Sequence, residues 1–305
     1  MRIGIFYDAG GTVDDIIKGA VGVEQDGFES FWMPHIMGPD ALMILALAGR
    51  ETSRIELGTS VVPVYGRHPV ALAQQALTVQ GASNGRLALG IGLSHQIVVE
   101  NMWGLSYEKP ARHMREYLSV LLPLLREGRV SFSGEVFNVN GVAQVRGASA
   151  PKVMIAALAP VMLRLAGEVT DGTVTWMCGI KTIETHIAPR INKAAESAGR
   201  PKPRVCVGLP IAVTDDAAGA REQAAKAFQM YGTLPNYQRV LAKEGTQSPG
   251  DVAIVGNEAE VERQLRALAA AGATDLLAAI FPSGEKPEAT YARTRALLKG
   301  LAAGR

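Results

Sequence analysis

A strand, a polar loop and a helix recur eight times along this chain, and that repeat constrains the fold more than any other feature. The third unit shows it most clearly, because the first half of residues 55–69 has the β-branched, apolar character of a buried strand. Pro63, Gly66 and Pro69 punctuate the loop that follows, and a helical pattern runs over residues 70–82. In a barrel of such units, the loops after the strands carry the site.

The other units follow the same plan. Short apolar runs predict strands at residues 3–7, 30–33, 86–91, 152–156, 172–177, 204–213 and 274–280. Periodic apolar positions predict helices at residues 12–26, 39–50, 109–126, 160–169, 181–198, 258–271 and 288–301, and Asp215 or Asp216 can cap a further helix. Pro210 interrupts the seventh strand and indicates an edge or a bend. Eight alternating units favour one (β/α)8 TIM barrel with insertions over a doubly wound sheet.

Two stretches depart from this repeat. Residues 130–142 alternate with period two, which predicts a hairpin insertion near 130–145. Residues 230–250 are rich in Gly, Pro, Asn and Gln and are too long for a simple connection, so we expect a lid-like, substrate-contacting insertion there. No Pro/Gly/Ser-rich linker divides the chain, and we therefore expect one domain over residues 1–305.

Composition narrows the class of protein. A chain of 305 residues with 48% hydrophobic residues can bury a large core, and its formal net charge of +2 with no basic, aromatic-rich run argues against nucleic acid as a partner. The two cysteines, Cys178 and Cys206, exclude a disulfide framework. The chain begins directly with a strand pattern and has no apolar run of about twenty residues, so we expect a cytoplasmic protein without a membrane partner.

Histidines cluster at the predicted strand ends. His35, His68 and His95, three of the five, follow the second, third and fourth strands. Any one of them is most simply a loop or helix-cap residue, but three on one face strengthen a functional reading. No His-Glu-x-x-His or His-x-His spacing supports a metal site, and the hydrolase, Rossmann and phosphate-loop motifs are absent.

Two later loops offer binding groups. The residues Ala157–Pro160 lead a helix without an acidic first turn, so free backbone N–H groups there could hold a phosphate, although every barrel helix begins in a similar way. Trp176 and Met177 could form a wall against a planar ring, or could be plain core residues. Cys178 has no cationic neighbour in sequence and is interpreted as an ordinary small residue.

Several motifs in order resemble the luciferase-like flavin and deazaflavin oxidoreductases, and within them the enzymes that use coenzyme F420. The matching stretches are Leu57–Pro63, Tyr65–Pro69, Ala73–Ala76, Asn84–Arg86, Leu89–His95, Ser133–Glu135, Met162–Glu168 and Asp171–Gly172. They cover the chain well from its start to about residue 198, and the remainder matches mainly in the order of helices and strands. The resemblance implies a (β/α)8 barrel with insertions, in agreement with the eight units.

The resemblance also implies a cofactor site. A non-proline cis peptide at Ser60–Val61 would form a bulge behind the deazaflavin ring, the loop Gly92–His95 would follow the ring and ribityl chain, and Ala157–Pro160 would take the phosphate. Many relatives have glycine where Ala159 stands. The full set of expected cofactor-binding residues is Pro34, His35, Thr59, Ser60, Val61, Tyr65, Gly92, Leu93, Ser94, His95, Ala157, Leu158, Ala159, Pro160, Trp176 and Met177.

His35 and His95 are the expected catalytic residues. His35 matches a histidine that acts as acid or base beside the ring in the sugar-phosphate dehydrogenase branch, and a histidine suits the proton that accompanies a hydride. That branch has an acidic residue before its histidine and a glutamate in the fourth loop, whereas this chain has Pro34 and His95. The difference argues against the sugar-phosphate activity and leaves hydride chemistry intact.

Three functions follow from this reading. The first is an oxidoreductase that transfers a hydride between coenzyme F420 and a small organic substrate that the sequence does not name. The second is an FMN-dependent monooxygenase of the same fold, and the third is a cofactor-binding protein without turnover. By resemblance, the protein would be a homodimer.

Overall fold

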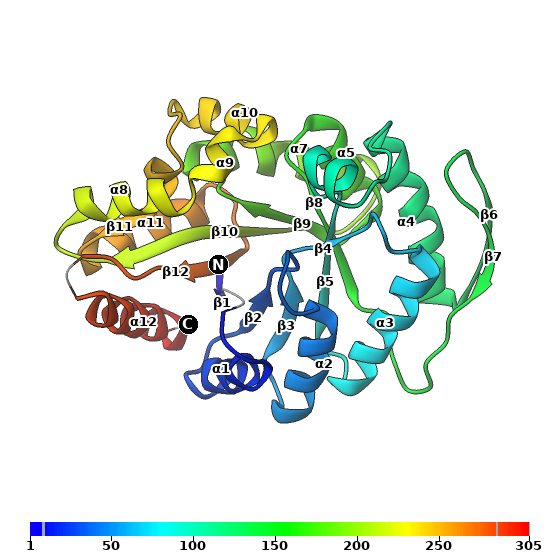
Figure 1. Ribbon diagram of the computed structural model, residues 1–305, viewed down its shortest axis with the longest axis horizontal. Helices are drawn as coiled ribbons and strands as arrows, with labels where there is room; N and C mark the ends of the chain where they lie inside the picture. The colour runs from blue at the N-terminus through cyan, green and yellow to red at the C-terminus, as the bar shows by residue number, and fades with distance from the viewer. Residues whose placement is uncertain (8–9, 285, 305) are drawn as a thin grey trace. The chain divides into compact units, whose positions relative to one another are not determined.

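The computed structural model describes residues 1–7, 10–284 and 286–304 (Figure 1). The chain divides into two compact units. The first unit comprises residues 1–8, 23–32 and 157–305, and the second comprises residues 9–22 and 33–156.

A parallel sheet forms the centre of the first unit. Its strands are β1 (Arg2–Phe6), β2 (Ser30–Met33), β9 (Gly172–Trp176), β10 (Arg204–Val213), β11 (Ile254–Gly256) and β12 (Asp275–Ile280). β1 pairs with β2 and β12, while β10 pairs with β12, β9 and β11. Most of these residues are buried, as expected for a parallel sheet covered on both faces.

Pro210 lies inside β10, and the strand continues through it, so the predicted interruption of the strand is wrong. β12 pairs with β10 from Cys206 to Ile211. On the other side of β10, pairing with β9 ends at Gly208 and pairing with β11 begins at Ile211. The carbonyl of Ile211 faces β12, so Pro210 faces the gap between β9 and β11, where no ladder N–H is needed.

The helices of the first unit are α5 (Pro160–Val169), α6 (Ile180–Thr182), the π-helix η2 (Ile183–Ile187), α7 (Ala188–Ser197), α8 (Ala217–Ala227), α9 (Gln229–Thr233), α10 (Pro235–Glu244), the 3-10 helix η3 (Pro249–Val252), α11 (Glu258–Ala270) and α12 (Pro287–Ala303). Asp216, not Asp215, caps α8 by accepting from Gly219 N, and Asn257 caps α11.

The stretch 230–250 is mostly helical, because α9, α10 and η3 contain most of its residues. Its function as a lid stays a prediction.

The second unit contains β3 (Glu56–Thr59), β4 (Val62–Pro63), β5 (Leu87–Gly92), β8 (Lys152–Ala156) and the antiparallel pair β6 (Arg129–Ser133) and β7 (Asn138–Val142). β5 pairs in parallel with β3, β4 and β8. Its helices are α2 (Ala41–Glu51), α3 (Pro69–Ala82), the π-helix η1 (Val98–Met102) and α4 (Pro110–Glu127). Helix α1 (Val13–Gln25) contributes residues to both units.

The β6–β7 pair is the hairpin expected near residues 130–145, and it lies beside α4 (Figure 1). The buried carboxylate of Glu116, on α4, holds its turn. One oxygen accepts from Val136 N at 2.7 Å and from Phe137 N at 3.0 Å, and the other accepts from Glu135 N at 3.2 Å. The carboxylate thus satisfies turn N–H groups that would otherwise lack partners.

Eight strand–helix units follow one another in chain order, and the fold is a (β/α)8 barrel, as predicted. The short strands β4 and β11 were not predicted, because two or three residues carry too little alternation to be distinguished from a loop. None of the described helices is long and apolar enough to span a membrane.

Asp275 is a buried carboxylate whose contribution to stability can be tested. Its side chain is 1% exposed, and it accepts from Arg204 at 2.6 Å and from Thr274 Oγ1 at 2.6 Å, with Arg2 3.3 Å away. Burial alone would raise the pKa of Asp275, but Arg204, Thr274 and Arg2 together outweigh burial, and the pKa lies below its ordinary value.

We expect Asp275→Asn to lower the free energy of unfolding at pH 7 by about 2 kcal/mol, because hydrogen bonds to a charged group are lost. Since the folded-state pKa is depressed, the wild-type advantage is complete above the unfolded-state pKa of about 3.9 and disappears as pH falls through the folded-state value. Urea unfolding of both proteins between pH 7 and pH 3 measures this. An equal stability difference at both ends of that range would contradict the assignment.

Candidate active site

The bulge expected after the third strand is present between β3 and β4. The Ser60–Val61 peptide bond is cis, which confirms the expectation from the resemblance. Thr59 is fully buried, and its hydroxyl donates to the Gly90 carbonyl at 2.7 Å and accepts from Gly90 N at 2.9 Å. Thr59 therefore ties the bulge to β5 and has no hydroxyl hydrogen left to donate to a ligand.

The fourth loop begins where β5 ends at Gly92. A Cβ at Gly92 would lie 2.6 Å from Val61 Cγ2, so glycine is needed for the bulge to approach β5. Ser94 has the left-handed φ of 59°, and its carbonyl accepts from Tyr107 Oη at 3.4 Å. The carbonyl of His95 accepts the first backbone hydrogen bonds of the next helical segment. Burial lowers the pKa of the His95 ring.

The ring of His35, in the second loop, lies between two hydrogen-bond donors. Its Nδ1 lies 3.1 Å from Ala41 N, and its Nε2 lies 3.2 Å from a guanidinium nitrogen of Arg67, which also binds Asp40 at 2.6 Å. Burial and the Arg67 charge lower the pKa of His35, and Asp40 opposes them only in part. The neutral ring has one acceptor nitrogen, so it accepts from only one of these two donors. Protonation would remove that acceptor as well, so the contacts favour the neutral ring.

Tyr65 is 5% exposed and begins a cluster of aromatic side chains. Its ring stacks on His113 at 4.2 Å and lies 5.3 Å from Tyr107, and His113 also stacks on Tyr117 at 6.2 Å. Burial raises the pKa of Tyr65 to about 12. Tyr65 Oη, His113 Nε2 and Tyr117 Oη are buried and have no hydrogen-bond partner among the described residues.

These contacts bring the predicted residues of the second, third and fourth loops together in the second unit. Arg67 joins His35 to the third loop, and Tyr107 joins Tyr65 to Ser94. His68 has a different role from this group: its Nδ1 accepts from Val70 N, and the residue thereby caps α3. Pro34, directly before His35, is buried, and Leu93, directly before Ser94, is partly buried.

The fifth loop lies in the first unit, where Ala159 is the N-cap residue of α5. No side chain caps this helix, its first turn has no acidic residue, and Ala159 and Pro160 are exposed. His186 Nε2 lies 2.7 Å from the Leu158 carbonyl. Ala157, one residue earlier, is buried.

Trp176 ends β9 within a second aromatic cluster. Its ring stacks on Phe6 at 5.2 Å and meets Phe228 and Tyr231 edge-on at 5.7 and 6.0 Å. Its Nε1 is buried and has no partner among the described residues. Met177 has the left-handed φ of 56°. Burial raises the pKa of Cys178 to about 12, in agreement with its interpretation as an ordinary buried residue.

Sequence reasoning did not select His113, Tyr107, Tyr117 or His186. Tyr107 precedes α4, while His113 and Tyr117 lie one turn apart on its buried face, where a helical pattern indicates only core. His186 is separated from Leu158 by 28 positions, so no local motif joins them. The only signal for either histidine in the sequence was its place among the apolar positions of a helical segment.

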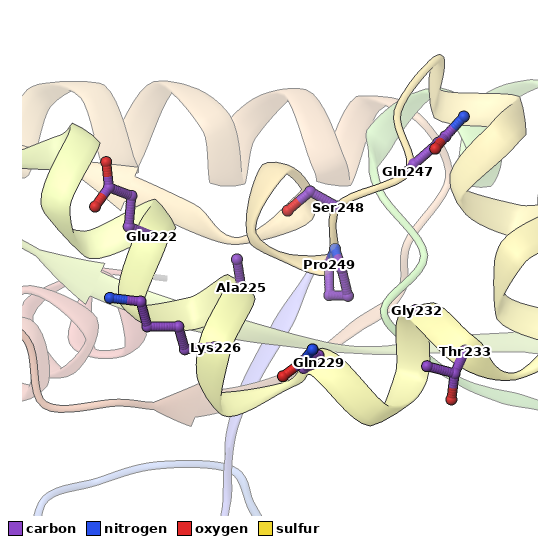
Figure 2. Close-up of a pocket in the computed structure, with 9 residues that line it drawn as sticks. All are labelled: Glu222, Ala225, Lys226, Gln229, Gly232, Thr233, Gln247, Ser248 and Pro249. Carbon is purple, nitrogen blue, oxygen red and sulfur yellow. The ribbon is translucent and has the colours of Figure 1, made fainter.

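An open cavity of about 600 Å³ lies elsewhere in the first unit, between α8, α9 and residues 247–249. Figure 2 shows Glu222 and Lys226 projecting from α8, with Ser248 and Pro249 facing that helix. None of the predicted catalytic or cofactor-binding residues lines it, although part of the lining belongs to the stretch 230–250. Across the described parts of the chain, no three His, Cys, Asp or Glu side chains are grouped as metal ligands would be.

Known proteins resemble this chain over its whole length. Two curated relatives are a 5,10-methylenetetrahydromethanopterin reductase of Methanolobus tindarius, 28% identical over 98% of this chain and 91% of the relative, and a putative coenzyme F420-dependent oxidoreductase of Mycobacterium tuberculosis, 31% identical over 65% of this chain and 62% of the relative.

Two solved structures share the fold. The coenzyme F420-dependent tetrahydromethanopterin reductase of Methanopyrus kandleri superposes with a TM-score of 0.75 at 22% identity, covering 96% of this chain and 97% of the other. The oxygenating constituent of 3,6-diketocamphane monooxygenase of Pseudomonas putida, in complex with FMN, gives 0.79 at 18% identity, covering 100% and 98%. The family model described as luciferase-like monooxygenase matches residues 1–303. The chain therefore belongs to the luciferase-like monooxygenase family.

Proposed function

We propose that this protein is an oxidoreductase that exchanges a hydride between coenzyme F420 and a small organic substrate. The observation that carries the oxidoreductase part of the proposal is the match to a 5,10-methylenetetrahydromethanopterin reductase over 98% of the chain. The F420-dependent oxidoreductase among the relatives and the fold shared with an F420-dependent reductase support it.

The residues present fit a deazaflavin. Tyr65 Oη in the second unit and Trp176 Nε1 in the first are each a buried donor without a partner among the described residues, and an acceptor atom of a cofactor or substrate would satisfy either group. The exposed, uncapped start of α5 offers N–H groups and a positive helix end to a phosphate. When bound, the deazaflavin carries the hydride at C5, and the chain positions it.

Each group of residues then has a task. Ser60 and Val61 would support the ring from behind, and the loop from Gly92 to His95 would follow the ring and ribityl chain. Ala157–Pro160 would hold the phosphate. The aromatic cluster at Trp176, with Phe228 and Tyr231 at and within α9, would exclude water from the substrate, which we place under residues 230–250. We also propose that the protein works as a homodimer.

An FMN-dependent monooxygenase is the second candidate, because the fold is equally that of a monooxygenase component solved with FMN. A phosphate-binding loop and a ring support serve either cofactor, so these features do not separate the two. The motifs of the third and fourth loops favour F420 by resemblance.

Titration of the purified protein with F420 and with FMN tests the proposal. We expect F420 to bind at low micromolar concentration or tighter, seen as a change in its fluorescence, and FMN to bind at least tenfold more weakly. Tighter binding of FMN would favour the monooxygenase, and binding of neither would overturn the proposed function. Full F420 affinity without reoxidation of reduced F420 by any of a panel of acceptors would indicate a binding protein without turnover.

A further inference from the structure

His186 is a buried histidine that the proposed function does not use. It lies in η2, is 5% exposed, and its Nε2 is 2.7 Å from the Leu158 carbonyl oxygen. A carbonyl oxygen can only accept, so Nε2 carries the hydrogen and donates. Nδ1 is therefore the nitrogen that lacks a hydrogen in the neutral ring, and it has no partner among the described residues.

This hydrogen bond fixes the direction of one peptide group. The Leu158–Ala159 bond is trans, so the Leu158 carbonyl and the Ala159 N–H point in opposite directions. Because His186 holds the carbonyl on its own side, the Ala159 N–H points away from His186. Ala159 and Pro160 are exposed and no side chain caps α5, so that N–H is available at the helix end where an anion binds.

The surroundings of His186 favour its neutral ring. Burial lowers the pKa of His186, the Leu158 hydrogen bond raises it, and the positive charges of Arg190 and Lys243 lower it further. Arg190 donates to the His186 carbonyl at 3.1 Å, which keeps its guanidinium beside the same turn. A neutral ring with its hydrogen on Nε2 is the form that donates to Leu158.

We infer that His186 is a positioning residue for the cofactor phosphate: by holding the Leu158 carbonyl, it aims the Ala159 N–H at the phosphate oxygen. The inference rests on the proposed function, since it needs a cofactor with a phosphate. His186 does not itself touch the reacting atoms.

The test compares two variants of similar length with two pairs of ligands. His186→Gln keeps an N–H near the Nε2 position, and His186→Met does not. We expect His186→Met to weaken F420 binding about tenfold and His186→Gln to restore it to within about threefold of wild type, because one hydrogen bond to the loop is worth about this much. Binding of the same deazaflavin without its phosphate should change less than twofold in either variant.

The matched control is Thr185→Val, an exposed neighbour in the same turn whose hydroxyl donates to the Lys181 carbonyl, and it should bind F420 as wild type does. Equal losses for the phosphate-bearing and phosphate-free ligands would overturn the inference and leave the proposed function standing. If wild type prefers FMN, the same comparison is made with FMN and riboflavin. If wild type binds neither cofactor, the proposed function and this inference both fall. Thermal unfolding of each variant identifies a loss that is only structural, and in that case His186→Gln alone decides.

Discussion

Replacing Gly90 with alanine is expected to lower the free energy of unfolding by about 3–5 kcal/mol. A Cβ at Gly90 would clash with the Thr59 carbonyl oxygen, a backbone atom that cannot rotate away. Overpacking of this kind costs about 1–3 kcal/mol. The two hydrogen bonds between the Thr59 hydroxyl and Gly90, at 2.7 and 2.9 Å, would also be lost at about 1 kcal/mol each.

Gly92 offers a matched control on the same strand. Its added Cβ would meet the side chain of Val61 at 2.6 Å and Ala156 Cβ at 3.2 Å, so the main obstacle is a side chain. We expect Gly92→Ala to cost less than Gly90→Ala, and the added change Val61→Ala to recover at least half of that cost. Val61→Ala should not rescue Gly90→Ala, because the obstacle there is backbone.

Urea denaturation of the two single variants, of Val61→Ala and of both double variants measures these differences as a double-mutant cycle. Gly300→Ala, where nothing lies within 4 Å of the added Cβ on a helix, should be neutral or stabilise by up to about 1 kcal/mol. If Val61→Ala rescues both glycine variants equally, the close approach of the Thr59 carbonyl to β5 is not what requires glycine at position 90.

The barrel could be predicted from sequence because each unit carries its own local signal. Asn257 with Glu258–Ala270 shows this well, since a cap and an amphipathic helix are both visible within a few residues. Pro210 shows the limit, because whether proline breaks a strand depends on where the neighbouring strands end, and that is set by residues far along the chain. Residues 235–244 are helical for a similar reason: Val240 and Leu241 are buried, and burial outweighs the weak local pattern.

The site was predictable as positions and not as contacts. The resemblance placed a cis bond at Ser60–Val61, and the structure has it. The tasks of individual side chains depend on three-dimensional neighbours: Thr59 binds β5, and His68 caps a helix. A hydroxyl or imidazole in a loop looks the same in sequence whether it faces a ligand or its own backbone, so these assignments needed the fold.

The ring contacts of His35 lead to the last prediction, which distinguishes the two expected catalytic histidines. Both nitrogens of His35 face donors, Ala41 N and Arg67, so a proton taken up by this ring would meet an N–H at either position. A general acid or base needs a nitrogen that is available to substrate. Under the proposed function, His35 therefore serves to hold the start of α2 beside Arg67, and we assign the proton transfer to His95, the other expected catalytic histidine.

We expect His95→Asn to lower kcat about 100-fold, the lower end of what a general acid or base contributes, and His35→Asn to lower it less than tenfold. Asparagine at position 35 can still accept from Ala41 N, so its fold should be kept. In the direction of the reaction that needs a base, the ring of His95 must be unprotonated. Because burial lowers the pKa of His95, the wild-type rate should stay constant as pH falls through the ordinary histidine pKa of about 6.5, and should decrease only at more acidic pH. Steady-state rates of the three proteins between pH 5 and pH 8 measure both effects. An equal or larger loss in His35→Asn, with the acid limb absent from that variant alone, would instead assign the proton to His35 and show that its contact with Arg67 opens when substrate binds.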